Sequence, residues 1–204
     1  MKKVLFTIFS IFCFVFTAFA QDSTMTVVGP GVKYHSVKKV DPYNIKILEI
    51  DISNQNIKIE TVLARDVLGT GFERTSTMAL RSNSNGHYVL GAINADFFGI
   101  SAPTNPYSFL GSSMVQNYEF NQGKYSARTS FGITGNKIPL FDKLTFTGEV
   151  KAKNNKTIGI TYVNQERITN SMVLYNKYMG ANTLTNQWGV EIKVEPIEPM
   201  AVNS

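Results

Sequence analysis

The sequence predicts an α+β fold, a strand-rich mixed or antiparallel sheet with one short helix. Apolar and polar residues alternate in short runs along most of the chain, and Gly, Asn, Pro and Ser separate these runs. Only one segment has apolar residues at helical spacing, and no internal repeat or regular alternation of strands with helices is present. These observations together favour a single strand-rich domain over a bundle or a parallel α/β sheet.

The first third of the chain is predicted to form a hairpin after an irregular start. Residues 28–41 contain Pro and Gly among polar residues and are expected to be a lead-in without regular structure. Residues 45–52 and 57–63 alternate with period two around the polar turn 53–56, which is typical of two antiparallel strands. A Gly-containing loop is expected at residues 66–73.

The one predicted helix spans residues 74–84, with Thr75 or Ser76 as its N-cap and Met78 and Ala79 facing inward. Its helix propensity is weak, so packing is expected to stabilise it. Residues 87–93 are apolar and are expected to form a strand that is buried on both faces.

The remaining segments predict a long loop and several more strands. Residues 99–125 contain two prolines and have little periodicity, and long loops in compact domains are usually functional or disordered. The later strands are predicted as a hairpin of 131–134 with 137–140 on the two-residue turn Gly135-Asn136, a hairpin of 144–150 with 158–162 around the turn 153–156, and single strands at 172–175 and 188–194. The last of these strands has no evident partner on its outer edge.

The N-terminal twenty residues have the three parts of a secretory signal peptide. Lys2 and Lys3 precede an apolar run at residues 4–16, and Ala18-Phe19-Ala20 is a small-x-small cleavage site. We therefore expect cleavage after Ala20 and export to the periplasm or the extracellular space. The run is shorter than the roughly 20 residues that span a bilayer, so no membrane association is expected after signal removal. Residues 21–204 are expected to form one domain.

Composition argues against several classes of function. Cys13 is the only cysteine and lies in the signal, so disulfides and Cys-based metal sites are not expected in the exported chain. The net charge is +5, and removal of Lys2 and Lys3 lowers it to +3, with scattered basic residues, which does not favour nucleic-acid binding. No metal site is expected, because the chain has only two histidines, and the sequence indicates no particular cofactor or oligomeric state.

Asn94 and Asp96 form the first candidate site, where they follow the apolar run of residues 87–93. On an extended segment, side chains two residues apart point to the same side, so the amide and the carboxylate could converge on a ligand. The alternative is an Asx-type turn that ends the strand, with Phe97 and Phe98 filling the core behind it. Spacing alone does not choose between a site and a turn.

A second candidate site combines a cation with amides, hydroxyls and one carboxyl. Charge-assisted hydrogen bonds from an arginine, with neighbouring amides and hydroxyls, are suited to an anionic or sugar ligand. The alternative is a turn-rich linker with a solvated arginine, and composition alone favours that alternative. The residues are Asn164, Arg167, Thr183, Asn186 and Glu191.

The order of several short motifs resembles the phosphodiester glycosidase domain family. The motifs are AINADFF at 92–98, FGIT at 131–134, VNQER at 163–167, VLYNKYMG at 173–180, TLTN at 183–186 and GVEIKV at 189–194. The resemblance covers roughly residues 29–194. The family includes the lysosomal uncovering enzyme, an N-acetylglucosamine-1-phosphodiester alpha-N-acetylglucosaminidase, and many exported bacterial proteins.

The resemblance implies an enzyme that hydrolyses a sugar-1-phosphodiester in envelope or extracellular glycans. Asn94, Asp96 and Glu191 would then be catalytic, and Arg167, Asn164, Thr183 and Asn186 would bind a carbohydrate or sugar-phosphate substrate. Family members continue with a late Asp-Gly-Gly-type motif that this sequence lacks, so a partial, N-terminal and middle portion of the domain is expected.

Two alternatives to the enzyme remain open. The first is a noncatalytic envelope protein that binds polysaccharide through aromatic residues of the 99–125 loop, namely Tyr107, Phe109, Tyr118 and Phe120. The second is an inactive truncated fragment whose last strand lacks a neighbour.

Overall fold

The computed structural model of the chain is strand-rich, with antiparallel sheets and one short α-helix among the residues that it describes. Those residues are 22–39, 43–69, 71–99, 107, 110, 113–117, 119–123, 128–144 and 146–195, so the expected signal peptide lies outside them. The strand-rich α+β prediction is confirmed at this level. The chain divides into two compact units, Met1–Ile57 and Lys58–Ser204, which are described separately below.

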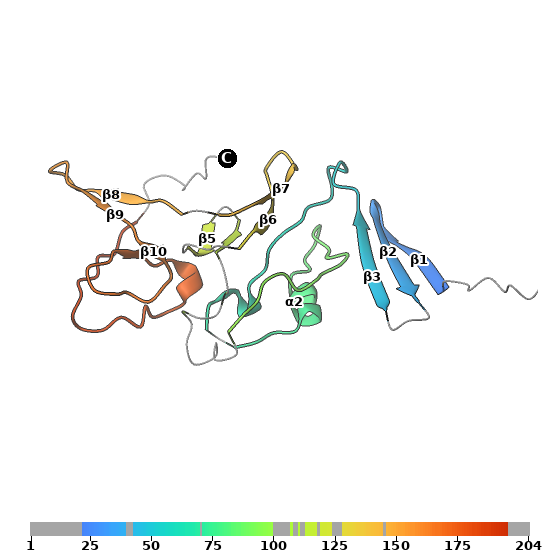
Figure 1. Cartoon of the computed structure of the whole chain (residues 1–204), viewed down its shortest axis with the longest axis horizontal. Helices are drawn as coiled ribbons and strands as arrows, with labels where there is room; N and C mark the ends of the chain where they lie inside the picture. Colours follow the sequence, from blue (N-terminus) through green and yellow to red (C-terminus); the bar gives the residue numbers. More distant parts are fainter. Residues whose placement is uncertain are drawn as a thin grey trace, which may run out of the picture. The chain divides into compact units, whose positions relative to one another are not determined.

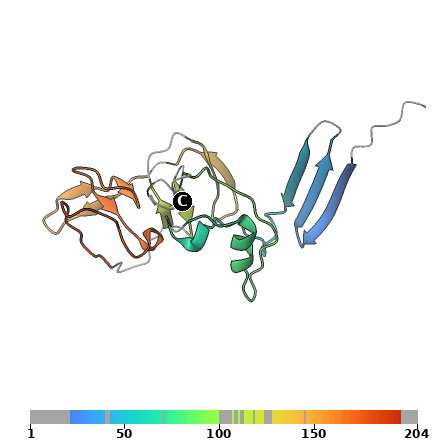
Figure 2. The same ribbon diagram turned by 90° about the horizontal axis from the view of Figure 1, so that it is seen from below.

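The first unit contains a three-stranded antiparallel sheet in the order β1-β2-β3, whose strands lie side by side in both views (Figures 1 and 2). The strands are β1 (Asp22–Gly29), β2 (Val32–Lys38) and β3 (Asn44–Ile50). Gly31, at a φ of 78°, turns the chain from β1 into β2, a conformation that glycine adopts without a steric penalty. The prediction of an irregular lead-in at residues 28–41 is therefore wrong.

β3 pairs with β2 and not with the segment that follows it. Ile47 lies opposite His35, which lies opposite Met25 on β1, so these three side chains share one face of the sheet. The predicted hairpin with residues 57–63 is wrong, because those residues form no strand. The polar turn does form: the Asp51 carboxylate accepts hydrogen bonds from the amide and the hydroxyl of Ser53, at 3.0 and 2.6 Å.

The predicted helix is confirmed as α2 (Thr75–Arg81) in the second unit. Its N-cap is Arg74, whose side chain forms no capping bond, so the expected capping role of Thr75 or Ser76 is wrong. The Thr75 hydroxyl instead donates to the Asn94 side-chain oxygen. Met78 and Ala79 are half-buried, as the helical pattern predicts.

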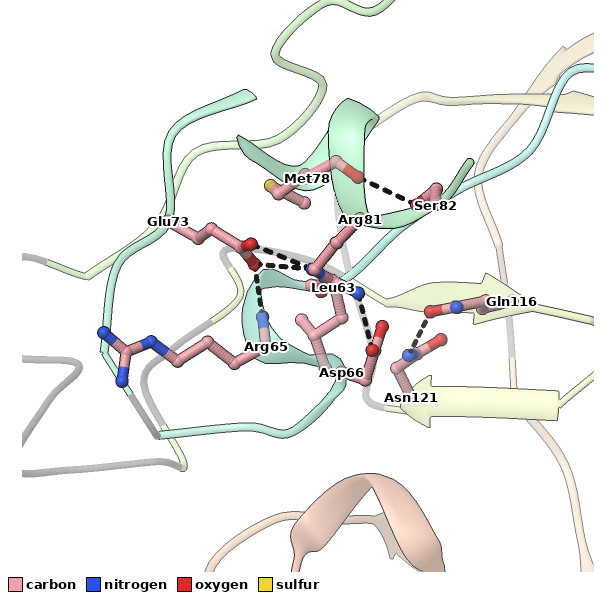
Figure 3. A network of polar contacts seen from close by, with 9 residues as sticks. All are labelled: Leu63, Arg65, Asp66, Glu73, Met78, Arg81, Ser82, Gln116 and Asn121. Atoms are coloured by element: carbon pink, nitrogen blue, oxygen red, sulfur yellow. Dashed lines mark hydrogen bonds and ion pairs between the residues drawn. The ribbon is translucent and has the colours of Figure 1, made fainter. Parts of the chain in front are cut away.

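Arg81 joins the end of α2 to the short 3-10 helix η1 (Ala64–Asp66). Figure 3 shows its guanidinium between the carboxylates of Glu73 and Asp66, at 2.8 and 2.6 Å, while a third bond of 2.7 Å goes to the Leu63 carbonyl. Glu73 and Asp66 raise the pKa of Arg81, because both favour its charged form. All three guanidinium nitrogens donate within the fold, so this arginine has a structural role.

The other strands of the second unit are short and form two-stranded pairs. β4 with β5, β6 with β7 and β8 with β9 are antiparallel, and β10 with β11 is parallel. The strands are β4 (Met114–Gln116), β5 (Glu119–Gln122), β6 (Ser130–Ile133), β7 (Pro139–Asp142), β8 (Glu149–Lys151), β9 (Thr157–Gly159), β10 (Tyr162–Val163) and β11 (Val173–Leu174). The predicted hairpins near Gly135 and Asn154 and the predicted strand near Val173 are therefore confirmed.

Both late hairpins close with the same three-residue loop. The Thr134 amide donates to Ile138 and the Lys137 amide to Thr134; the corresponding bonds in the second hairpin join Ala152 to Lys156 and Asn155 to Ala152. The third loop residue has a positive φ in each, 62° and 63°. This is the conformation expected of a type I turn followed by a left-handed residue. The predicted two-residue turn at Gly135-Asn136 is thus one residue longer.

The core of the second unit is small. Its buried apolar cluster brings η1 and the following loop together with the 3-10 helix η3 (Lys177–Met179), and the Leu68 amide donates to the Tyr178 carbonyl at 2.8 Å. The buried members are Leu63, Leu68, Leu110, Tyr178 and Met179. Among the described residues, no helix is long and apolar enough to cross a bilayer.

Two predicted strands are not formed. Residues 87–93 are irregular, and Ile93 is 77% exposed, so the prediction of a strand buried on both faces is wrong. Residues 188–194 also belong to no sheet in the part of the chain described here. Alternation of apolar residues favours an extended backbone, but it does not provide the neighbouring strand that a sheet needs.

Candidate functional site

Arg167 lies at the centre of a polar cluster in the second unit. It follows β10, and its Nη2 donates to the Asn186 side-chain oxygen at 2.6 Å, a bond that joins the loop after β10 to the loop after η3. The side chain is half-buried. Because the other guanidinium N–H groups have no acceptor among the described residues, they are available to a ligand. Below, the Arg167 cluster denotes Arg167, Thr183, Thr185, Asn186 and Glu191.

Gly189 allows the arginine to approach the backbone closely. A Cβ atom at this position would lie 2.6 Å from Arg167 Cζ and 2.8 Å from Nε, which is closer than real Cβ contacts allow. Gly189 and Glu191, two residues apart, thus both face the Arg167 cluster, as an extended backbone requires. Any larger residue at position 189 must displace the guanidinium.

Glu191 is held by two threonine hydroxyls. Thr183 donates to its Oε1 at 2.7 Å, and Thr185 donates to the same oxygen. These bonds, with the charge of Arg167, lower the pKa of Glu191 below its usual value. The carboxylate is therefore ionised over the whole neutral range, and Oε2 has no partner among the described residues.

Two tyrosines border the cluster, and the sequence did not predict that they would lie there. Tyr107 donates from its hydroxyl to the Thr183 carbonyl at 2.5 Å, and Tyr175 donates to the Gln165 carbonyl at 2.9 Å. Burial and the adjacent Tyr107 hydroxyl raise the pKa of Tyr175 to about 12, so it stays neutral. Tyr107 thus holds the loop after η3, Tyr175 holds the loop after β10, and the two hydroxyls bond to each other. The only sequence signal for them was the tyrosine of VLY and an aromatic in the long loop.

The structure thus brings four of the seven predicted site residues together: Arg167, Thr183, Asn186 and Glu191. The arrangement presents a cation with open donors beside an ionised carboxylate with an open acceptor. Such a pair can bind a ligand that carries both an anionic group and hydroxyls. Trp188, whose amide donates to the Asn186 side chain at 3.1 Å, adds an exposed indole next to these groups in the chain.

Asn164 is not part of this cluster. It is fully buried, and its Nδ2 donates to the Asn121 carbonyl at 2.8 Å and to the Asn176 side-chain oxygen at 2.6 Å. Its own oxygen accepts from the Asn176 amide at 3.0 Å. These bonds tie Asn121 in β5, Asn164 after β10 and Asn176, two residues after β11, together, so both polar atoms of the Asn164 side chain are used within the fold.

Asn94 and Asp96 lie on an exposed segment, and the side-chain hydrogen bonds described for them go to Thr75 and Phe97, which are not members of the Arg167 cluster. The Asn94 oxygen accepts from Thr75 in α2. The Asp96 carboxylate accepts from the next amide, that of Phe97, at 2.7 Å. The expectation that Phe97 and Phe98 fill the core is wrong, because both are exposed. Phe98 packs against Phe72 with the rings tilted at 52° and their centroids 5.2 Å apart.

The two aromatic residues of the long loop that the structure describes contact other parts of the fold. Tyr107 bonds to Thr183, and Phe120 packs edge-on against Phe146 with ring centroids 5.2 Å apart. Phe109 and Tyr118 lie outside the described residues. Among the residues that the structure covers, no group of three or more His, Cys, Asp or Glu side chains is arranged to hold a metal ion.

Comparison of the chain with protein-family models, with curated proteins and with solved structures gives no match.

Proposed function

We propose that the Arg167 cluster binds a sugar phosphodiester and that the protein is an exported, phosphodiester glycosidase-like hydrolase of envelope or extracellular glycans. The observation that supports this proposal is the arginine with open donors beside an ionised glutamate. The motif resemblance supplies the reaction, and the local chemistry supplies the ligand class.

The two charges would bind different parts of one ligand. Arg167 would donate its free N–H groups to the phosphate oxygens, where a planar guanidinium fits well. Glu191 Oε2 would accept from sugar hydroxyls, while its Oε1 stays bonded to Thr183 and Thr185. Inorganic phosphate can bond only to the arginine, whereas a sugar phosphate can also donate its hydroxyls to Glu191, so the cluster favours a phosphate linked to a sugar.

The lowered pKa of Glu191 decides which catalytic role it can have. Hydrolysis of a glycosidic bond needs one carboxylic acid to protonate the leaving oxygen and one carboxylate to act as nucleophile or base. An acid needs a raised pKa, whereas Glu191 is ionised, so it suits the carboxylate role. Asp96 is our candidate for the acid, on the resemblance alone.

Binding is tested by calorimetry with N-acetylglucosamine 1-phosphate as the probe. Arg167→Gln removes the charge and most of the N–H donors but leaves a polar side chain, and we expect about a ten- to hundred-fold loss of affinity. Lys153→Gln, an exposed change of the same charge in the β8–β9 loop, is the matched control and should bind normally. Equal affinity of the Arg167→Gln variant and the unchanged protein would exclude the cluster as the phosphate site.

Turnover is tested by release of free sugar from a sugar-1-phosphodiester. Glu191→Gln and Asp96→Asn are each expected to abolish measurable hydrolysis, since each removes one of the two carboxyl groups. An unchanged rate in either variant removes that residue from the reaction.

A noncatalytic polysaccharide-binding protein is the second candidate. It is favoured by the Asp96 carboxylate, which bonds to the amide of its own neighbour, and by the exposed Trp188 indole, since apolar ring faces suit sugar rings. Saturable binding of the probe that depends on Arg167, without any release of sugar, would support this candidate over the hydrolase.

A further inference from the structure

Residues 190–195 follow a turn at Gln187-Trp188 and a bend at Gly189, and they have no partner strand among the described residues. Among the described residues, no hydrogen bond is formed by the backbone amides or carbonyls of residues 189–195. Four apolar side chains alternate along the 188–195 segment and are exposed by 81% for Trp188, 88% for Val190, 80% for Ile192 and 70% for Val194. Backbone with unpaired amides and carbonyls can add a strand from another chain when it is extended.

The two sides of the segment differ. Gly189 and Glu191 face the Arg167 cluster, and the ion pair of Lys193 with Glu195, at 3.1 Å, is also on the odd-numbered side. Val190, Ile192 and Val194 therefore share the opposite side, away from the cluster. One polar side and one apolar side are what a strand in a sheet normally has.

Two copies of the segment have complementary charges when they pair antiparallel with Ile192 at the centre. In an antiparallel pair with that centre, Val190 lies opposite Val194, and Glu191 lies opposite Lys193, in both directions. Parallel, in-register pairing would instead place Glu191 opposite Glu191 and Lys193 opposite Lys193. Opposite charges across a strand pair stabilise it, and like charges destabilise it, so one register is favoured over the other.

We propose that the 188–195 segment pairs with the same segment of a second copy of this chain, antiparallel and with the two-fold axis at Ile192. The charge complementarity at this register argues for a second copy and not for an unrelated strand. Pairing would satisfy the open backbone groups and would bring the apolar rows of both copies side by side. The proposal does not depend on the proposed function.

Disulfide cross-linking tests the register directly. With Cys13→Ser, an introduced cysteine is the only one in the chain. Ile192→Cys should give a disulfide-linked dimer under mild oxidation, because paired Cα atoms lie about 5 Å apart, within disulfide range. Val190→Cys is the matched control. It is equally exposed, but its two copies would lie about 14 Å apart, so it should stay monomeric on a nonreducing gel.

Sedimentation of the unoxidised protein tests whether Glu191 and Lys193 pair across the dimer. Lys193→Glu places like charges opposite each other twice in the dimer, so we expect its dissociation constant to rise about ten-fold. Lys151→Glu, an exposed change on β8 with the same effect on net charge, should leave the dimer intact.

Three results would overturn the proposal. A chain that sediments as a monomer at every concentration, with no cross-link at position 192, shows that no second copy binds here. Equal cross-linking at 190 and 192 indicates parallel pairing and rejects the two-fold at Ile192. Equal effects of Lys193→Glu and Lys151→Glu reject the charge pairing. Because both cysteine positions are exposed, loss of folding is not expected, and circular dichroism checks it.

Discussion

His87 is held between two hydrogen-bond acceptors, which favours its protonated form. Its Nδ1 lies 2.9 Å from the Ser82 carbonyl and its Nε2 lies 3.1 Å from a Glu60 carboxylate oxygen. A neutral imidazole donates from one nitrogen only, whereas imidazolium donates from both. The Ser82 carbonyl first, and then Glu60, raise the pKa of His87 above its usual 6.5.

Protonation of His87 is therefore expected to stabilise the fold in acid. The contribution is fully present below pH 6.5 and is lost as the pH rises through the raised pKa. His87→Gln should lower the melting temperature more at about pH 5.5 than at about pH 8.5. Asn85→Gln, in the same turn, should show no such difference. A His87→Gln effect that is the same at both pH values would contradict the role of protonation.

The buried amide of Asn164 is expected to be a major source of stability. Asn164→Ala removes three hydrogen bonds and leaves buried partners unsatisfied, which should lower the free energy of unfolding by about 3 kcal/mol. Asn155→Ala is the matched control, because both asparagines have a positive φ, 51° and 63°, but Asn155 is exposed. It should cost about 1 kcal/mol. Urea denaturation measures both, and equal losses would contradict the structural role of Asn164.

At the residue scale, the sequence predicted which residues form the Arg167 cluster, but it did not predict how their side chains are bonded. Arg167, Thr183, Asn186 and Glu191 were proposed from residue type and motif order, and they do lie together. The burial of Asn164 was not predictable, because its partners are 12 and 43 residues away in the chain. Only the folded structure shows which polar groups form hydrogen bonds with one another.

The N-terminus of α2 is the element with the clearest local defect. Arg74 is its N-cap, with a φ of −71° and a ψ of 141°, and it forms no side-chain bond to the helix. A cation is also unfavourable at the positive end of the helix dipole. Arg74→Ser should raise the free energy of unfolding by about 1 kcal/mol, because serine caps from this backbone conformation. Thermal denaturation measures the gain, and an equal gain from Arg74→Ala would show that capping is not the cause.

Local elements were predictable from sequence, whereas strand partners were not. The β6–β7 and β8–β9 hairpins and α2 depend on neighbours within a few residues, and all three predictions are confirmed. The strand β3 was recognised but given the wrong partner, because alternation fits β2 as well as the residues after the turn. The apolar run before Asn94 was predicted to be buried on both faces, but Val89 and Leu90 are only partly buried and Tyr88 and Ile93 are exposed.

At the scale of the whole chain, the boundary between the two units is expected to be the easiest place to cut. Residues 58–62 follow Ile57, belong to no helix or strand, and form no backbone hydrogen bonds with described residues. Proteases cleave backbone that is exposed and unpaired. Trypsin should therefore cut after Lys58 before it cuts after Lys46, an exposed lysine within β3. Mass spectrometry of early fragments checks the order, and prior cleavage at Lys46 would contradict it.

The close approach of Gly189 to Arg167 connects ligand binding at the Arg167 cluster with pairing of the 188–195 segment, and Glu191 takes part in both. A ligand that holds the guanidinium also restrains the backbone of the segment next to it, since the two are in contact. A restrained segment loses less conformational entropy when it pairs with a second copy, so the dimer forms at a lower cost in free energy. Thermodynamic linkage makes the effect reciprocal, so ligand tightens the dimer by the same factor by which the dimer tightens ligand binding. Gly189→Ala places one methyl group between the guanidinium and the backbone, so we expect it to remove the coupling between ligand binding and dimerisation.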